Sequence, residues 1–241
     1  MKQFKKLSAA MLLAALGMAG SAMAADDLSV TGGVHGATGY QYRGIQFSDG
    51  EASIGAHITA AHSSGLYGTL KTDTIKLTEG TGRHQFQSAL TVGYTESLSS
   101  GLKVNGGFTR NIFSGKDHAS VLSFSEAFVG ANWNGVSGKI STVVEGAKLQ
   151  VPGFSQGDTY GELGYTHTIG KYSVGGDVGY NWYDSKNIGT KNGLALAQVR
   201  ATYAINKQTH VMVAHQFAGD DAYGDTNTGA HKTVLKFCYM F

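Results

Sequence analysis

The chain has 241 residues, including 35 glycines and one proline, and a formal net charge of +2 at pH 7. Glycine costs a helix about 1 kcal/mol relative to alanine, so this composition argues against a helical bundle. The single cysteine, Cys238, excludes an internal disulfide. The small net charge gives no support to a nucleic-acid partner.

Residues 1–24 have the features of a secretory signal peptide. Three lysines within the first six residues precede an apolar stretch, 7–19, that is too short to span a bilayer. Ala22-Met23-Ala24 is a small-x-small cleavage site. Its removal leaves 16 of the 19 Lys and Arg against 17 Asp and Glu, a net charge near −1. We expect 25–241 to form one domain.

Beyond residue 24, apolar and polar side chains alternate in short stretches bounded by turn residues, which indicates half-buried β-strands. In 171–183, for example, Tyr172, Val174 and Val178 face one way while Ser173 and Asp177 face the other. Each stretch is near the ~9–11 residues of a tilted membrane strand. The twelve predicted strands cover residues 28–40, 51–62, 66–76, 84–97, 101–113, 120–132, 136–148, 159–169, 171–183, 194–205, 208–218 and 230–241.

The connections between these strands alternate in length. Short turns at 63–65, 99–101, 134–135, 169–171 and 206–207 are separated by longer loops at 41–50, 77–83, 113–119, 149–158, 184–193 and 219–229. Short periplasmic turns and longer outer loops are typical of outer-membrane barrels. The sequence thus predicts an all-β fold, a transmembrane antiparallel up-and-down β-barrel of about twelve strands with both termini periplasmic. A soluble β-sandwich is not expected to show this alternation of loop lengths.

The last stretch, 233–241, resembles the closing strand of such a barrel. Leu235, Phe237, Tyr239 and Phe241 share one face, and the chain ends on an aromatic residue. In outer-membrane barrels such an ending is the assembly signal. We therefore expect the barrel-assembly machinery and the outer-membrane lipids, including lipopolysaccharide, to be partners of this chain.

Aromatic residues recur near the ends of the predicted strands. Two girdles at the two headgroup levels are the expected arrangement in a membrane barrel. We assign Tyr40, Tyr42, Phe113, Tyr160, Trp182 and Phe217 to the girdle near the outer loops. Tyr67, Trp133, Tyr172, Tyr203 and Phe241 are assigned to the girdle near the short turns.

If the apolar face of each strand meets lipid, the alternation sends charged side chains inward. An Arg or Lys on the lipid side would cost ~2–4 kcal/mol at the midplane. The predicted pore-lining residues are Arg43, His57, Lys71, Asp73, Lys103, Lys139, Glu145, Glu162, Asp177, Arg200 and Lys236. They favour a narrow pore with a weak anion or neutral preference, although paired charges could also pack a closed barrel that does not conduct.

Arg43 lies beside Gly44, which permits a tight turn at the mouth of the first strand. Two roles are equally compatible with the sequence. Arg43 forms part of a constriction, or it anchors its loop through a salt bridge to Asp49 or Glu51.

The segment 121–133 fits the alternation poorly. Phe124 and Phe128 share a face with Glu126, so that face either exposes a carboxylate to lipid or puts two phenylalanines in the lumen. We favour the inward orientation or a β-bulge in this strand.

Residues 38–50, T-G-Y-Q-Y-R-G-I-Q-F-S-D-G, are similar to the opening of the TorF family, a proteobacterial outer-membrane family assigned as porins. The R-G-I core at 43–45 and the S-D-G turn at 48–50 carry the resemblance, and the following H-S-S-G-L-Y at 62–67 matches the family's next turn. The chain departs from the family at Thr38-Gly39 and at Leu70-Lys71. The resemblance covers roughly residues 28–75 and implies a porin that passes small hydrophilic solutes.

Two other functions compete with a channel. A barrel enzyme acting on lipids would need a nucleophile and a histidine near the lipid interface, for which His167 and His215 are candidates. No H-E-x-x-H motif is present, and the sequence suggests no catalytic residues, metal site or cofactor. A binding or adhesion barrel would use its loops, such as the acidic 219–229, whose oxygens could hold Ca²⁺.

Overall fold

The computed structural model describes residues 24–25, 27–76, 85–98, 101–114, 119–149, 151–184, 191–219 and 231–241. The predicted signal peptide lies outside this set except for Ala24, as do most of the predicted loops 77–83 and 219–229. Within the described part of the chain, no helix is both long enough and apolar enough to cross a membrane.

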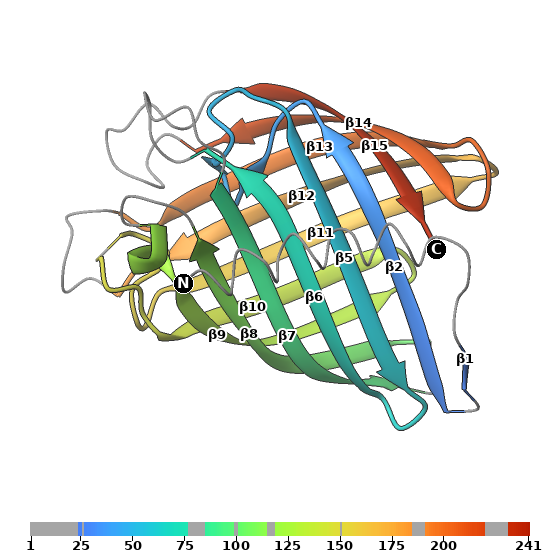
Figure 1. The fold of residues 1–241 in the computed structure, drawn as a ribbon, viewed down its shortest axis with the longest axis horizontal. Helices are drawn as coiled ribbons and strands as arrows, with labels where there is room; N and C mark the ends of the chain where they lie inside the picture. The colour runs from blue at the N-terminus through green and yellow to red at the C-terminus, as the bar shows by residue number, and fades with distance from the viewer. Residues whose placement is uncertain are drawn as a thin grey trace.

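Twelve antiparallel strands form a closed barrel (Figure 1). Consecutive strands pair with each other, and β2 pairs with both β5 and the last strand, which closes the cylinder. The strands are β2 (Leu28–Ala37), β5 (Ser53–His62), β6 (Leu66–Ile75), β7 (Gln85–Ser97), β8 (Lys103–Ser114), β9 (Phe124–Trp133), β10 (Val136–Glu145), β11 (Thr159–Ile169), β12 (Tyr172–Trp182), β13 (Gly193–Ala204), β14 (Thr209–Ala218) and β15 (Lys232–Met240).

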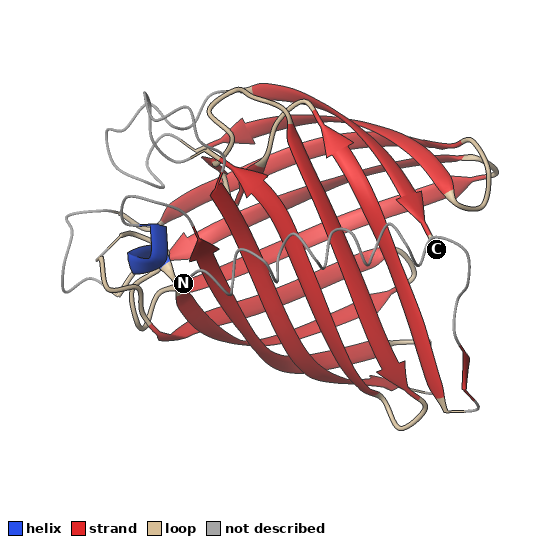
Figure 2. Cartoon of the chain, viewed as in Figure 1, coloured by secondary structure: helices blue, strands red, loops and turns tan. Residues whose placement is uncertain are grey.

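Among the described residues, only a few outside these twelve strands adopt regular secondary structure (Figure 2). A short strand, β1 (Ala24–Ala25), pairs with the start of β2. Strands β3 (Gln41–Tyr42) and β4 (Ile45–Gln46) form a separate hairpin in the first long loop, and a 3-10 turn, η1 (Ala119–Leu122), precedes β9. The predicted all-β barrel is confirmed, and the first barrel strand, β2, begins and the last, β15, ends at the short-turn end.

Three predicted boundaries are wrong for local reasons. The first strand ends at Ala37 rather than 40 because the chain then turns into the β3–β4 hairpin. The sixth begins at Phe124 because η1 occupies 119–122. The seventh ends at Glu145 rather than 148, next to an irregularity in its pairing with β9.

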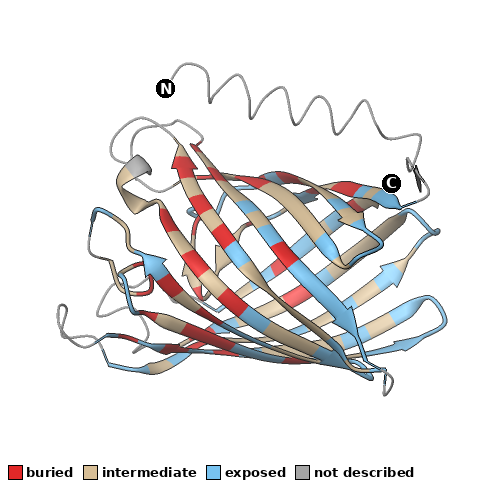
Figure 3. Ribbon diagram, turned by 90° about the horizontal axis from the view of Figure 1, so that it is seen from below, coloured by how far each residue is buried: buried red, intermediate tan, exposed pale blue. Residues whose placement is uncertain are grey.

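The barrel exposes its apolar side chains and covers its polar ones. Leu163, Val174, Val178 and Val199 lie exposed on the outer face, whereas Asp73, Asn111 and Glu126 are buried in the lumen. Buried positions gather toward the long-loop end, and the short-turn end is mostly exposed (Figure 3). A continuous apolar exterior of this kind is stable in hydrocarbon rather than in water, so this is the fold of a transmembrane outer-membrane barrel.

Candidate functional site

The first long loop, residues 38–52, folds into the barrel mouth and is called the inward loop here. Its β3–β4 hairpin turns at Arg43 and Gly44, whose φ angles are 51° and 87°. Positive φ at both central residues is characteristic of the type I′ turn, whose twist matches that of the two paired strands. The turn places the Arg43 side chain at the tip of the hairpin.

Arg43 binds the far wall of the barrel. Its guanidinium nitrogen lies 2.6 and 2.8 Å from the two carboxylate oxygens of Glu126 and 3.0 Å from the Ser141 hydroxyl. It also lies over the ring of Tyr160, 4.5 Å from the centroid. Burial acts to lower the pKa of Arg43, but Tyr42 and Glu126 outweigh it and hold that pKa above its ordinary value. The group is a permanent cation.

Other residues of the inward loop are fixed as well. The Tyr40 hydroxyl donates to Gln87 Oε1 at 3.0 Å, and a second tight turn at Asp49-Gly50 closes with a bond from the Glu51 N–H to the Ser48 carbonyl. Asp49 and Glu51 pair with Lys76 instead of Arg43. The predicted alternative, a salt bridge from Arg43 to Asp49 or Glu51, is therefore wrong. Arg43 does form a salt bridge, but its partner is Glu126 on the far side of the lumen.

Above this hairpin, six buried apolar residues form the mouth cluster: Phe47, Ile75, Phe113, Phe124, Val143 and Phe154. Phe124 and Phe154 stack with their centroids 4.7 Å apart, and Phe47 meets Phe113 edge to face at 5.6 Å. Phe47 comes from the inward loop and Phe154 from the loop after β10, whereas the others end barrel strands. Two long loops are thus packed onto the rim over β6 to β10.

Below the inward loop lies a cavity of about 370 Å³, called the polar chamber here. It is lined with groups of both charges and with amides, hydroxyls and tyrosine rings. The lining residues are Tyr40, Gln41, Tyr42, Arg43, Lys71, Asp73, Gln87, Ala89, Thr91, Thr109, Asn111, Glu126, Lys139, Tyr160, Glu162, Leu196, Gln198 and Gln216.

Most charges of the lumen are paired across strands. Lys71 Nζ and His35 Nε2 each lie 3.0 Å from an oxygen of Asp73. Arg200 pairs with Asp177, to which Gln198 also donates at 2.8 Å. These contacts distribute fixed polar groups around the bore.

Ten of the eleven predicted pore-lining residues lie on the lumen side. Arg43 reaches it from the inward loop, and His57, Lys71, Asp73, Lys103, Lys139, Glu162, Asp177, Arg200 and Lys236 reach it from the strands, with Lys103 at the short-turn rim. The polar chamber brings together five of them: Arg43, Lys71, Asp73, Lys139 and Glu162.

Glu145 is the exception and needs a correction. The pairing of β10 with β9 shifts between Val143 and Glu145, so Glu145 lies opposite Ser125 on the outer face. There it accepts a bond from Arg110 at 2.7 Å. A bulge adds one residue, which reverses the direction of every side chain beyond it. The strand parity predicted from the start of the stretch therefore fails at its end.

The predicted outer girdle also needs correction. Trp182 and Phe217 face outward, but Tyr40, Tyr42, Phe113 and Tyr160 lie inside the mouth. At the short-turn end, Trp133, Tyr172, Tyr203 and Phe241 face outward, whereas Tyr67 faces inward over Gly93. An aromatic residue near a strand end can contact the lipid headgroups, but loops that cover the barrel mouth can bury such a residue equally well.

Glu126 and His35 are lumen groups that the predicted pore-lining set lacks. Phe124, Glu126 and Phe128 face inward, in agreement with the favoured orientation of 121–133, and Glu126 is 3% exposed. The alternation of 124–128 was the available signal for Glu126. His35 lies on the same face of β2 as Gly33, two positions away. The sequence around it contains no charge pattern that indicates a lumen position.

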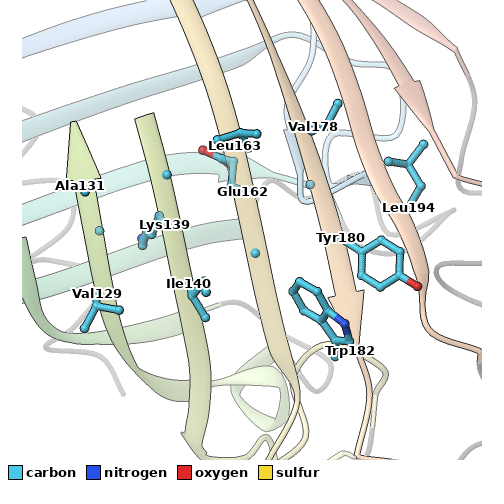
Figure 4. A pocket seen from close by; sticks show the side chains of 14 residues that line it. Val129, Ala131, Lys139, Ile140, Glu162, Leu163, Val178, Tyr180, Trp182 and Leu194 are labelled. Atoms are coloured by element: carbon cyan, nitrogen blue, oxygen red, sulfur yellow. The ribbon is translucent and has the colours of Figure 1, made fainter. Parts of the chain in front are cut away.

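A second hollow lies outside the lumen. It measures about 590 Å³ and is apolar, with Val129, Ile140 and Leu163 around the small residues of the outer face (Figure 4). The Trp182 ring lies over Gly161, where a Cβ atom would meet it at 2.7 Å. Because this surface faces the acyl chains of the membrane, we place the functional site in the polar chamber instead.

Comparisons with solved structures show the fold. The NanC porin has a TM-score of 0.54 at 9% identity, covering 87% of this chain and 98% of that one. Outer membrane phospholipase A from Salmonella typhi, a dimer with bound calcium, has a TM-score of 0.52 at 12% identity over 94% and 96%. The Escherichia coli phospholipase has a TM-score of 0.51 at 12% identity over 88% and 92%.

Neither a protein-family model nor a curated protein matches the sequence. Within the described ranges, no group of three or more His, Cys, Asp and Glu residues lies close enough to hold a metal ion. The similar structures therefore show the fold of an outer-membrane β-barrel, and the function has to be inferred from the lumen of this chain itself.

Proposed function

We propose that this chain is a porin-like channel of the outer membrane that passes small hydrophilic solutes or ions by passive diffusion. The polar chamber carries the proposal, because a cavity of about 370 Å³ lined by charges and amides holds water and hydrated solutes. Twelve strands also exceed the ~8 at which side chains just fill a barrel.

The inward loop would form the constriction of this channel. It narrows the bore from one side. Arg43 is the only cation among the described residues at its tip, and Glu126 and Ser141 hold its guanidinium group in place. Charge at a constriction sets ion selectivity. Because Arg43 and Glu126 compensate each other, the native channel should discriminate weakly between anions and cations.

Single-channel recording in planar bilayers tests the proposal. The purified protein should give discrete conductance steps, and Arg43→Ala should shift the reversal potential toward cation preference because Glu126 is left uncompensated. Absence of steps in the wild type defeats the channel while leaving the fold intact. An unchanged reversal potential in Arg43→Ala would remove Arg43 from the constriction.

A lipid-acting enzyme is the second candidate, supported by one observation. On the outer face, His215 Nδ1 lies 2.9 Å from the Thr233 hydroxyl, which is the distance of a base to a nucleophile. His215 packs against Phe217 and so lies near the outer end of β14. Release of fatty acid from phospholipid vesicles, abolished by Thr233→Ala, would favour the enzyme. Absence of release from wild-type protein in vesicles would exclude it.

A further inference from the structure

The charges that line the polar chamber cancel. It contains three cations, Arg43, Lys71 and Lys139, and three carboxylates, Asp73, Glu126 and Glu162. Arg43 is bound to Glu126 and Lys71 to Asp73 in contacts of 2.6 and 3.0 Å, and both carboxylates are almost fully buried. Lys139 lies directly opposite Glu162 across β10 and β11. An ionic solute would find each fixed charge already compensated.

Some hydrogen-bonding groups of the same chamber have no partner among the described residues. Asn111 is 2% exposed, and its Nδ2 has no hydrogen-bond partner among the described residues. The Oε1 atoms of Gln41 and Gln216 also have none within that part of the chain. Buried amide groups without partners are costly, so they need water or a solute. One donor and two acceptors in one cavity match a ligand that both accepts and donates, as hydroxyl groups do.

Aromatic surface completes the lining. Tyr40, Tyr42 and Tyr160 border the cavity from the inward loop and from β11. A site that combines ring surface with a few oriented polar groups fixes a small organic ligand better than an inorganic ion. Amides beside aromatic rings are the side chains that recognise sugars, whose hydroxyls and C–H faces need both.

We propose that the polar chamber is a binding site for a neutral, hydroxyl-rich solute of the carbohydrate class. This inference rests on the proposed channel, because it names the solute that the channel would pass. Asn111, Gln41 and Gln216 bind hydroxyl groups in place of water, and the paired charges keep the site neutral. A bound sugar occupies the bore below the inward loop and reduces the ion current while it resides there.

Planar-bilayer recording with a neutral disaccharide, maltose, tests this. Maltose should reduce the ion current beyond the loss of bulk conductivity of the same solution, with a saturable concentration dependence. Asn111→Leu and Gln216→Leu should each raise the half-blocking concentration roughly three- to tenfold, which is the expected cost of one lost hydrogen bond. Asn105→Leu is the matched control. Asn105 lies on β8 like Asn111, and its Oδ1 also has no hydrogen-bond partner among the described residues, but Asn105 lies outside the chamber.

The outcomes separate the two proposals. A channel that conducts but loses no more current than the bulk solution overturns the sugar site and leaves the channel standing. Tighter block by glucuronate than by maltose, at constant ionic strength, overturns the neutral solute class. A protein that does not conduct but binds maltose by calorimetry in detergent, with the same effects of the three variants, supports the site while the channel fails. Absence of both overturns both.

Discussion

The contact between Arg43 and Glu126 makes a quantitative prediction about the inward loop. Arg43→Met keeps most of the side-chain volume and removes the cation, which leaves Glu126 buried at 4% side-chain exposure without its partner. Removing one member of a buried ion pair typically costs ~3–5 kcal/mol. That cost falls on the docked state of the loop, because an undocked loop returns Glu126 to water.

Hydrogen exchange measures this cost directly. The Phe47 N–H bonds to the Tyr40 carbonyl at 2.9 Å within the loop. Its exchange protection should fall roughly 100- to 4,000-fold in Arg43→Met, since each ~1.4 kcal/mol is a factor of ten. Protection in β12 should stay unchanged. Combining Arg43→Met with Glu126→Leu should restore part of the protection, because no charge is then left buried.

Arg110→Met is the matched control for this experiment. It also breaks an Arg–Glu pair, that of Arg110 with Glu145, but this pair lies exposed on the outer face. Exposed pairs contribute only ~0–1 kcal/mol. If Arg43→Met changes loop protection no more than Arg110→Met does, the Arg43–Glu126 pair does not hold the loop in the barrel and the reasoning is refuted.

Three further predictions test other parts of the structure. Leu163→Arg places a cation near the middle of the lipid face and should lower unfolding stability in vesicles by ~2–4 kcal/mol, whereas equal stability would mean that this face does not meet lipid. Phe154→Ala should cost ~3–5 kcal/mol of packing in the mouth cluster and speed proteolysis of the loop after β10; unaltered proteolysis would show that the cluster does not fix this loop. Gly135→Ala meets the Thr166 carbonyl, whereas Gly170→Ala meets nothing, so the first should lower the urea midpoint more than the second, and a reversed order would contradict the described turn.

The sequence was a good guide to the barrel because side-chain alternation and turn chemistry act locally. Each predicted strand exists, and the Asn134-Gly135 turn joins β9 to β10 as expected. Within strands, parity placed nine lumen charges on the inner side. It failed at Glu145 because a bulge is a single-residue event, and one residue is enough to reverse the faces.

The mouth was harder to predict because its contacts join distant segments. Arg43 and Glu126 are 83 positions apart in the chain, and the mouth cluster draws on four strands and two loops. An aromatic residue at a strand end has the same local pattern whether it faces lipid or the interior. The pattern around Tyr160 therefore predicts a girdle position, although its ring lies under the Arg43 guanidinium.

In this barrel, one face of each strand lines water and the other meets lipid. Gln198 and Val199 are neighbours on β13, the first lining the polar chamber and the second exposed on the outer face. Each would be changed to cysteine in a Cys238→Ser background and treated with a membrane-impermeant maleimide in lipid vesicles. The structure predicts that the cysteine at 198 reacts and the cysteine at 199 is protected by lipid. Reaction at 199 with protection at 198 would contradict it.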